Sequence, residues 1–174
     1  MNLDNLFKNF CKKNNLEINT YQLTIINKLK NYYRSNFNKS IFKKLFLKND
    51  LKPFFYLHGG VGVGKTMILN FFFDLVEEKK LRQHFNEFML SFHDFAHEKK
   101  EKNEENVINQ FVKNLKSKTK LIYFDEFQVT NIVDAMILGK LFEQIFKEDI
   151  KIILTSNIKI SELYKDGLQR DQFK

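Results

Sequence analysis

The chain is 174 residues long, with 43% hydrophobic and 29% charged residues, which fits a globular domain and excludes a disordered segment. It has no apolar run of membrane-spanning length and no secretion signal at its start, and its single cysteine, Cys11, cannot form an internal disulfide, so we expect a soluble, intracellular protein. The formal net charge of +8 comes from lysines scattered in pairs, which favours solvated lysines and a phosphate-bearing ligand over a nucleic-acid or membrane surface.

Residues 1–50 are predicted to form a polar, largely helical N-terminal segment that precedes the main domain, residues 51–174. Within residues 16–29 the apolar side chains recur near the helical period, at Leu16, Leu23, Ile26 and Leu29. A second short helix is expected at residues 41–46.

The main domain alternates apolar strands with helices. Its first strand is predicted at residues 54–57, whose continuous apolar run is typical of a strand buried on both faces. The elements expected after it are a helix at 65–80, a strand at 85–90, a helix at 91–118 with an exposed charged stretch at 98–105, a strand at 121–124, a helix at 131–147 and a strand at 150–154. This alternation predicts an α/β fold with a parallel sheet, in which ligands bind at the carboxyl ends of the strands.

A glycine-rich loop connects the first predicted strand to a helix. Its spacing, Gly59-x-x-x-x-Gly64-Lys65-Thr66, matches the phosphate-binding P-loop in full. Glycines permit positive φ angles, and the loop can then direct its N–H groups at phosphate oxygens beside the positive end of the helix dipole. We expect Lys65 to reach the β- and γ-phosphates and Thr66 to place its hydroxyl on Mg²⁺. The predicted nucleotide-binding residues are Gly59, Gly60, Val61, Gly62, Val63, Gly64, Lys65 and Thr66.

Polar side chains also end the two later strands. An apolar strand that ends in Asp-Glu is the Walker B arrangement, so Asp125 is expected to hold Mg²⁺, mostly through water, and Glu126 to polarise the attacking water. Asn157 suits a residue that hydrogen-bonds the γ-phosphate or that water, although asparagine at a strand end is also an ordinary turn former. All of these residues are predicted to lie at the same edge of the sheet as the P-loop.

Two histidines share a predicted helix face, His93 and His97. Their i, i+4 spacing is that of a zinc-binding helix, but an aspartate (Asp94) stands where the zinc-binding motif has its glutamate, and no third ligand is evident nearby. An ordinary helix face is the favoured interpretation.

Three stretches of the chain, residues 59–74, 125–138 and 163–173, resemble the ZapE-type ATPases. These are bacterial cell-division ATPases of the AAA+ class, related to the mitochondrial lactation-elevated protein. The resemblance implies that Lys65 and Thr66 belong to Walker A, Asp125 and Glu126 to Walker B, and Asn157 to sensor 1. It further implies that Arg170 is an arginine finger that reaches the ATP of a neighbouring subunit.

The same resemblance implies self-association and a protein client. Bacterial members act at the division ring on the cytoplasmic face of the membrane, and mitochondrial members act in protein quality control. The resemblance also implies a sheet with the strand order five, one, four, three, two. Family members continue well past the region of Arg170 with a fifth strand and a helical lid, so we expect residues 51–174 to be an incomplete P-loop ATPase core.

Three functions remain open at this point. ATP hydrolysis with Mg²⁺ is the leading hypothesis. The alternatives are nucleotide binding without turnover and a DNA-associated ATPase of the helicase-loader kind, although the run from Phe127 to Met136 favours the division-type family. A GTPase is disfavoured because the chain has no Asn-Lys-x-Asp motif.

Overall fold

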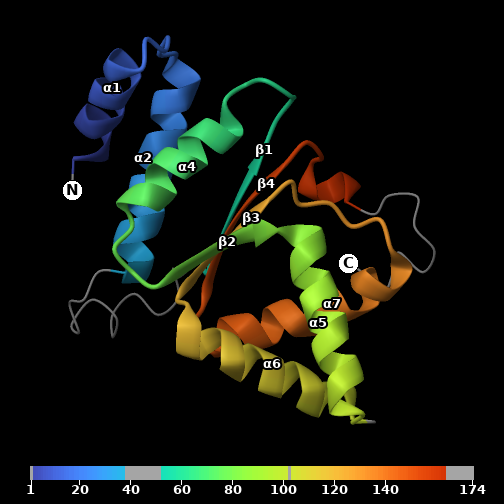
Figure 1. Ribbon diagram of the computed structural model, residues 1–174. Helices are drawn as coiled ribbons and strands as arrows, with labels where there is room; N and C mark the ends of the chain where they lie inside the picture. Colours follow the sequence, from blue (N-terminus) through green and yellow to red (C-terminus); the bar gives the residue numbers. More distant parts are fainter. Residues whose placement is uncertain (1, 38–51, 102, 164–174) are drawn as a thin grey trace.

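The computed structural model describes residues 2–37, 52–101 and 103–163, in which a sheet lies between two layers of helices (Figure 1). The layer on one face holds α1 (Leu3–Lys13), α2 (Thr20–Phe37) and α4 (Lys65–Leu75). The layer on the other face holds α5 (Phe85–Lys99), α6 (Glu104–Lys118) and α7 (Ile132–Lys147). A short 3₁₀ helix, η1 (Ile160–Glu162), follows the last strand. None of the helices in these ranges combines the length and the apolar character needed to cross a bilayer.

The sheet is parallel and has four strands in the described part of the chain: β1 (Phe54–His58), β2 (Lys80–His84), β3 (Leu121–Asp125) and β4 (Lys151–Ser156). Their spatial order is β1-β4-β3-β2, and each neighbouring pair is parallel. The predicted α/β fold is confirmed, and so is the order one, four, three, two. Because all strands run the same way, their carboxyl ends lie at one edge of the sheet.

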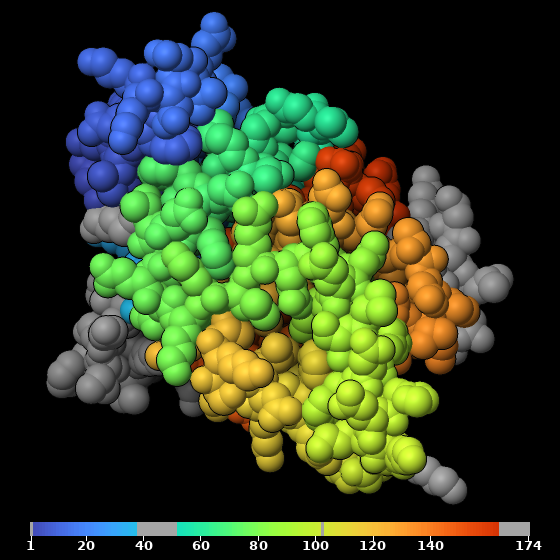
Figure 2. All heavy atoms as spheres, viewed as in Figure 1, coloured from blue at the N-terminus to red at the C-terminus, as the bar shows by residue number. Residues whose placement is uncertain are grey.

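The core is built on both faces of the central strands. Every residue of β3 and β4 is buried, whereas β1 and β2 are partly exposed. Phenylalanines dominate the packing, and each fully buried one stabilises the fold by roughly 1.5–3 kcal/mol. On the side of the molecule that Figure 2 shows, atoms of the helices hide much of the sheet. The continuous burial of β3 and β4 explains why their apolar runs were readable as strands.

The strand predicted at residues 85–90 is wrong, because those residues form the first turns of α5. Buried positions there follow the helical spacing i, i+3, i+4, i+7, at Phe85, Phe88, Met89 and Phe92. The helix begins where the Glu87 carboxylate accepts a hydrogen bond from the His84 backbone N–H, at 3.3 Å. The second strand is β2; its first residue, Lys80, was predicted as the end of a helix, and residues 81–84 were assigned to no element.

The helix predicted at residues 65–80 ends early, at Leu75. The next residue, Val76, turns to extended backbone and is buried. The Lys80 ammonium of β2 then donates hydrogen bonds to the carbonyl oxygens of Phe73 and Asp74, at 2.5 and 3.1 Å. A cation at the last carbonyls of α4 favours termination there.

The N-terminal helices pack on the same sheet as the main domain. The Tyr32 hydroxyl of α2 donates a hydrogen bond to the carbonyl oxygen of Ile152 in β4, at 3.2 Å. Leu16, predicted as part of a helical stripe, is 39% exposed in the connection between α1 and α2. The expected short helix at 41–46 and the boundary after residue 50 lie outside the described residues.

Candidate functional site

The loop from Gly59 to Gly64 joins β1 to α4 and has the backbone of an anion-binding turn. Gly62 and Gly64 have φ angles of 79° and 84°, where a residue with a Cβ would be strained. The Gly59 N–H donates a hydrogen bond to the carbonyl oxygen of Ser156, at 3.2 Å, and this ties the loop to the end of β4. Because Gly64 precedes the first residue of α4, the loop wraps the positive end of that helix.

Lys65 is only 8% exposed, and its ammonium lies inside this loop. It donates hydrogen bonds to the carbonyl oxygens of Gly59 and Gly60, at 2.8 and 2.7 Å, and to Asn157 Oδ1, at 2.9 Å. An ammonium has three donors, so these bonds satisfy it completely. The P-loop lysine and the residue at the end of β4 are thus brought together, and a phosphate would replace some of these acceptors.

Asp125 ends β3 opposite Thr66, the second residue of α4. The Thr66 hydroxyl lies 3.4 Å from Asp125 Oδ1. The same carboxylate oxygen accepts a 2.7 Å hydrogen bond from the Thr155 hydroxyl of β4. Hydroxyl and carboxylate oxygens are the donors that Mg²⁺ prefers, so these residues fit that cation.

Arg82 of β2 contacts the other oxygen of the same carboxylate. Its Nη2 donates to Asp125 Oδ2 at 2.8 Å, and its guanidinium carbon lies 5.1 Å from the centre of the Tyr123 ring. Burial by itself raises the pKa of Asp125, but the hydrogen bonds from Thr155 and Arg82 and the Arg82 charge outweigh it and hold the pKa below its ordinary value. The carboxylate is therefore ionised near neutral pH.

Glu126 follows β3 in a left-handed conformation, with a φ of 54°. Such a backbone is uncommon for a residue with a side chain and costs on the order of 1 kcal/mol. The end of β4 holds this turn: the Glu126 N–H donates to the Thr155 hydroxyl at 3.1 Å, and the Phe127 N–H donates to the Thr155 carbonyl at 2.6 Å. The Ser156 hydroxyl donates to the Phe127 carbonyl at 2.7 Å. These bonds fix the backbone of Glu126 while its side chain remains exposed.

Most of the predicted site residues line one cavity of about 290 Å³ at the carboxyl ends of the strands. Its walls are Val61, Gly62, Gly64, Lys65, Thr66, Met67, Glu126, Thr155, Ser156 and Asn157. Arg170 lies outside the described residues. Two residues that the sequence analysis missed are Thr155, which bonds Asp125 and the Glu126 backbone, and Arg82. Lys80, Arg82 and His84 alternate along β2, and this pattern could have marked Arg82 as a residue near the site. The sequence analysis did not predict a strand at residues 80–84.

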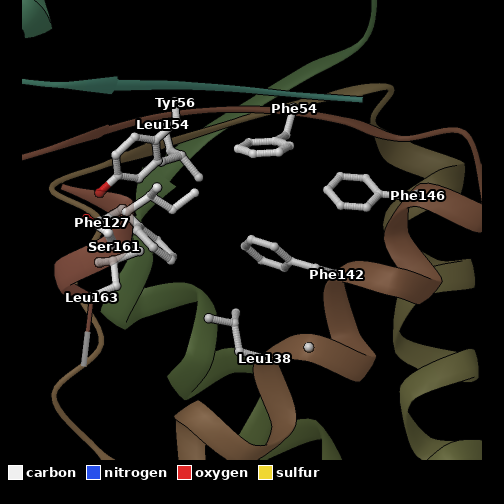
Figure 3. A pocket seen from close by; sticks show the side chains of 11 residues that line it. Phe54, Tyr56, Phe127, Leu138, Phe142, Phe146, Leu154, Ser161 and Leu163 are labelled. Atoms are coloured by element: carbon white, nitrogen blue, oxygen red, sulfur yellow. The ribbon is translucent and has the colours of Figure 1, made fainter. Parts of the chain in front are cut away.

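A second, larger cavity of about 540 Å³ has a different chemistry (Figure 3). Phe54 and Tyr56 of β1 face Phe142 and Phe146 of α7 across it. No charged side chain lines it in the described part of the chain. A polyphosphate therefore suits the smaller cavity beside the P-loop.

The two histidines of α5 form no metal cluster with other residues in the described ranges. His93 Nε2 lies 2.7 Å from Asp134 Oδ1, which links α5 to the first turn of α7. This contact joins the helices that follow β2 and β3.

Comparisons of the sequence identify relatives. The family model of the AFG1-like ATPases matches residues 5–174. Lactation elevated protein 1 homolog B of Danio rerio is 43% identical over 129 residues, which is 68% of this chain and 26% of that protein. The cell division protein ZapE of Escherichia coli K12 is 40% identical over 121 residues, which is 68% of this chain and 31% of that protein. The chain thus matches only about a quarter to a third of the length of these relatives.

Comparisons of the structure identify the fold. The AMPPCP-bound DnaA of Aquifex aeolicus superposes with a TM-score of 0.59 and 16% identity, covering 92% of this chain and 45% of that chain. The crystal structure of DnaI gives a TM-score of 0.52 and 18% identity, covering 88% of this chain and 78% of that one. At these identities the likeness concerns the fold, an AAA+-type P-loop domain.

Proposed function

We propose that this chain, which belongs to the AFG1-like ATPase family, binds ATP together with Mg²⁺ and hydrolyses it. The observation that carries the proposal is the convergence of Lys65, Thr66, Glu126 and Asn157 on one polar cavity, with Asp125 directly behind Thr66. These residues lie far apart in the sequence, and the fold brings them together.

The phosphate groups are held by the loop and by Lys65. The N–H groups of such a loop and of the first turn of the helix that follows it are suited to bind an anion, and the helix dipole adds to the attraction. Lys65 is already held inside the loop by carbonyl oxygens and Asn157, so its charge is in place before the ligand arrives. A phosphate oxygen is a stronger acceptor for an ammonium than a carbonyl, because both partners are charged.

A magnesium ion would be held by Thr66 directly and by Asp125 through water. When bound, it neutralises charge on the phosphate oxygens. Thr155 keeps Asp125 in place by donating to Oδ1, the oxygen that lies nearest Thr66. The ionised state of Asp125 favours a cation at this position.

Glu126 is the residue that orients and activates water. Glu126 lines the cavity, its backbone N–H is held by Thr155, and its exposed side chain is placed to reach a water beside the γ-phosphate. A positioned carboxylate can accept the proton of the attacking water as the water oxygen bonds to the γ-phosphorus and the bond between that phosphorus and the bridging oxygen breaks, which releases ADP. Asn157, within hydrogen-bond reach of Lys65, suits the γ-phosphate side of the site.

The proposal is tested by the substitution Lys65→Ala and a fluorescent ATP analogue. We expect binding to be lost, because the loop would keep its N–H groups but lose its buried cation. Lys28→Ala is the matched control, since it removes the same charge from an exposed position of α2. Affinity that is unchanged in Lys65→Ala would refute the proposal, whereas loss in both variants would point to a general charge effect.

A further inference from the structure

Arg82 stands apart from the residues that line the nucleotide cavity. It comes from β2, whereas the cavity is lined by the loop after β1 and by the ends of β3 and β4. Its side chain is 42% exposed, and its guanidinium is held on one side by Asp125 and on the other by the face of Tyr123. The proposed function assigns no role to this positively charged side chain.

The contacts of Asp125 divide between its two oxygens. Oδ1 receives the Thr155 hydroxyl and lies nearest Thr66, while Oδ2 receives Arg82. Arg82 therefore occupies the oxygen that faces away from the proposed metal position. Hydrogen bonds at both oxygens restrict rotation of the carboxylate, so the Arg82 bond to Oδ2 acts together with the Thr155 bond to Oδ1 to keep Oδ1 directed at Thr66.

We propose that Arg82 is a positioning residue for Mg²⁺, which fixes the Asp125 carboxylate so that Oδ1 faces Thr66 before the metal binds. This inference rests on the proposed function, because it assigns a role in the metal site of that function. Groups that hold a metal ligand from behind typically contribute 10- to 100-fold to metal affinity. The proposal thus extends the site to β2, the strand farthest from the P-loop in the sheet.

The opposite role, competition of Arg82 with the metal, is disfavoured by the geometry. A competitor would sit on the oxygen that faces Thr66, and Arg82 does not. Its partial exposure to solvent also screens its repulsion of a nearby cation. Its contact with Tyr123 holds it in place, and a stacked guanidinium suits a fixed support better than a mobile ion.

The experiment measures how much Mg²⁺ is needed for a fluorescent ATP analogue to bind to the whole chain. We expect Arg82→Gln to raise the half-saturating Mg²⁺ concentration about 10-fold or more, with affinity in EDTA within about twofold of the wild type. Arg82→Lys should recover part of this loss, since it restores the charge without the planar fork. In an Asp125→Asn background, Arg82→Gln should add little, because both changes act through the same carboxylate.

Lys80→Gln is the matched control. Lys80 lies on the same strand two residues away and also carries one positive charge, but it contacts the last carbonyls of α4 rather than Asp125. It should leave the Mg²⁺ requirement unchanged. Thermal melting of each variant checks folding, and if Arg82→Gln does not fold, Arg82→Lys decides by its own, smaller increase.

Three results would overturn the inference while leaving the proposed function intact. A lower Mg²⁺ requirement in Arg82→Gln would make Arg82 a competitor, and an unchanged requirement would make it a bystander. A full effect of Arg82→Gln on top of Asp125→Asn would also contradict it. If the wild-type chain bound no nucleotide with or without Mg²⁺, the proposed function itself would fail, and this inference with it.

Discussion

The central strands and the outer strands of the sheet contribute differently to the molecule. β3 and β4 are buried along their whole length and end in the anionic and hydroxyl groups of the site, Asp125 and Thr155. β1 and β2 are partly exposed, and each is associated with a cation: Lys65, which follows the loop after β1, donates to Asn157, and Arg82 of β2 donates to Asp125. The buried strands thus end beside the carboxylates, and the positive charges come from residues associated with the two outer strands.

The two outer strands also differ from each other. β2 carries Lys80, Arg82 and His84 at alternate positions, and such charged residues are usual on a strand that borders solvent. β1 is Phe-Phe-Tyr-Leu-His, a composition typical of an interior strand, yet it pairs only with β4 in the described part of the sheet. Beside it lies the apolar cavity of Figure 3. β1 therefore presents an apolar face whose composition suits burial.

The largest expected effect is a difference in the free energy of unfolding between substitutions in a central strand and in an outer strand. Phe124→Ala in β3 removes a side chain that is 0% exposed and should lower the free energy of unfolding by about 3–5 kcal/mol. Phe54→Ala in β1 removes one that is 39% exposed and should cost only about 1 kcal/mol. Urea denaturation of both variants measures the difference. Equal losses would show that β1 is as much a part of the core as β3.

The next effect concerns turnover, which we assign to the centre. Glu126→Gln should lower ATP hydrolysis at least about 10²-fold, because the amide cannot accept the proton of the attacking water. Binding of the ATP analogue should persist, in contrast to Lys65→Ala at the start of α4. Phosphate release and analogue binding are measured on the same sample. A wild type that binds but does not hydrolyse would favour nucleotide binding without turnover, and equal rates in both proteins would remove Glu126 as the base.

The central strands and the phosphate-binding loop were predictable from the sequence. Continuous apolar runs mark β3 and β4, and the P-loop spacing is long and specific enough to identify both its strand and its helix. The parallel order of the strands then places Asp125 and Asn157 near Lys65, as the structure shows for Asn157 directly.

The outer strand β2 was not predictable in the same way. It contains one apolar residue, Leu81, because it borders solvent, and the aromatic residues after it belong to a helix that packs on the sheet. Without β2, no signal placed Arg82 beside Asp125. The role of Thr155 also needed the structure, because its bonds to Asp125 and Glu126 depend on the pairing of β4 with β3.

The smallest expected effect tests the difference between the two outer strands. Phe54→Lys places a charge on the apolar face of β1, and Gln83→Lys places the same charge on β2, so both variants change the net charge of the chain equally. Burying a lysine against a partner chain is costly, and this is one way in which natural edge strands avoid pairing. We therefore expect Phe54→Lys to reduce self-association of the chain, while Gln83→Lys, on a strand that is already charged, should change it little.

Light scattering over a concentration series, at fixed ionic strength and without nucleotide, measures this effect. Both variants add one positive charge, so general charge repulsion affects their association equally. A difference in association between the two variants therefore reports on β1. Thermal melting establishes that Phe54→Lys still folds; its stack with Phe146, with ring centres 6.4 Å apart, is the packing that it loses. Equal association of both variants and the wild type would mean that the apolar face of β1 does not mediate contacts between chains, despite its composition.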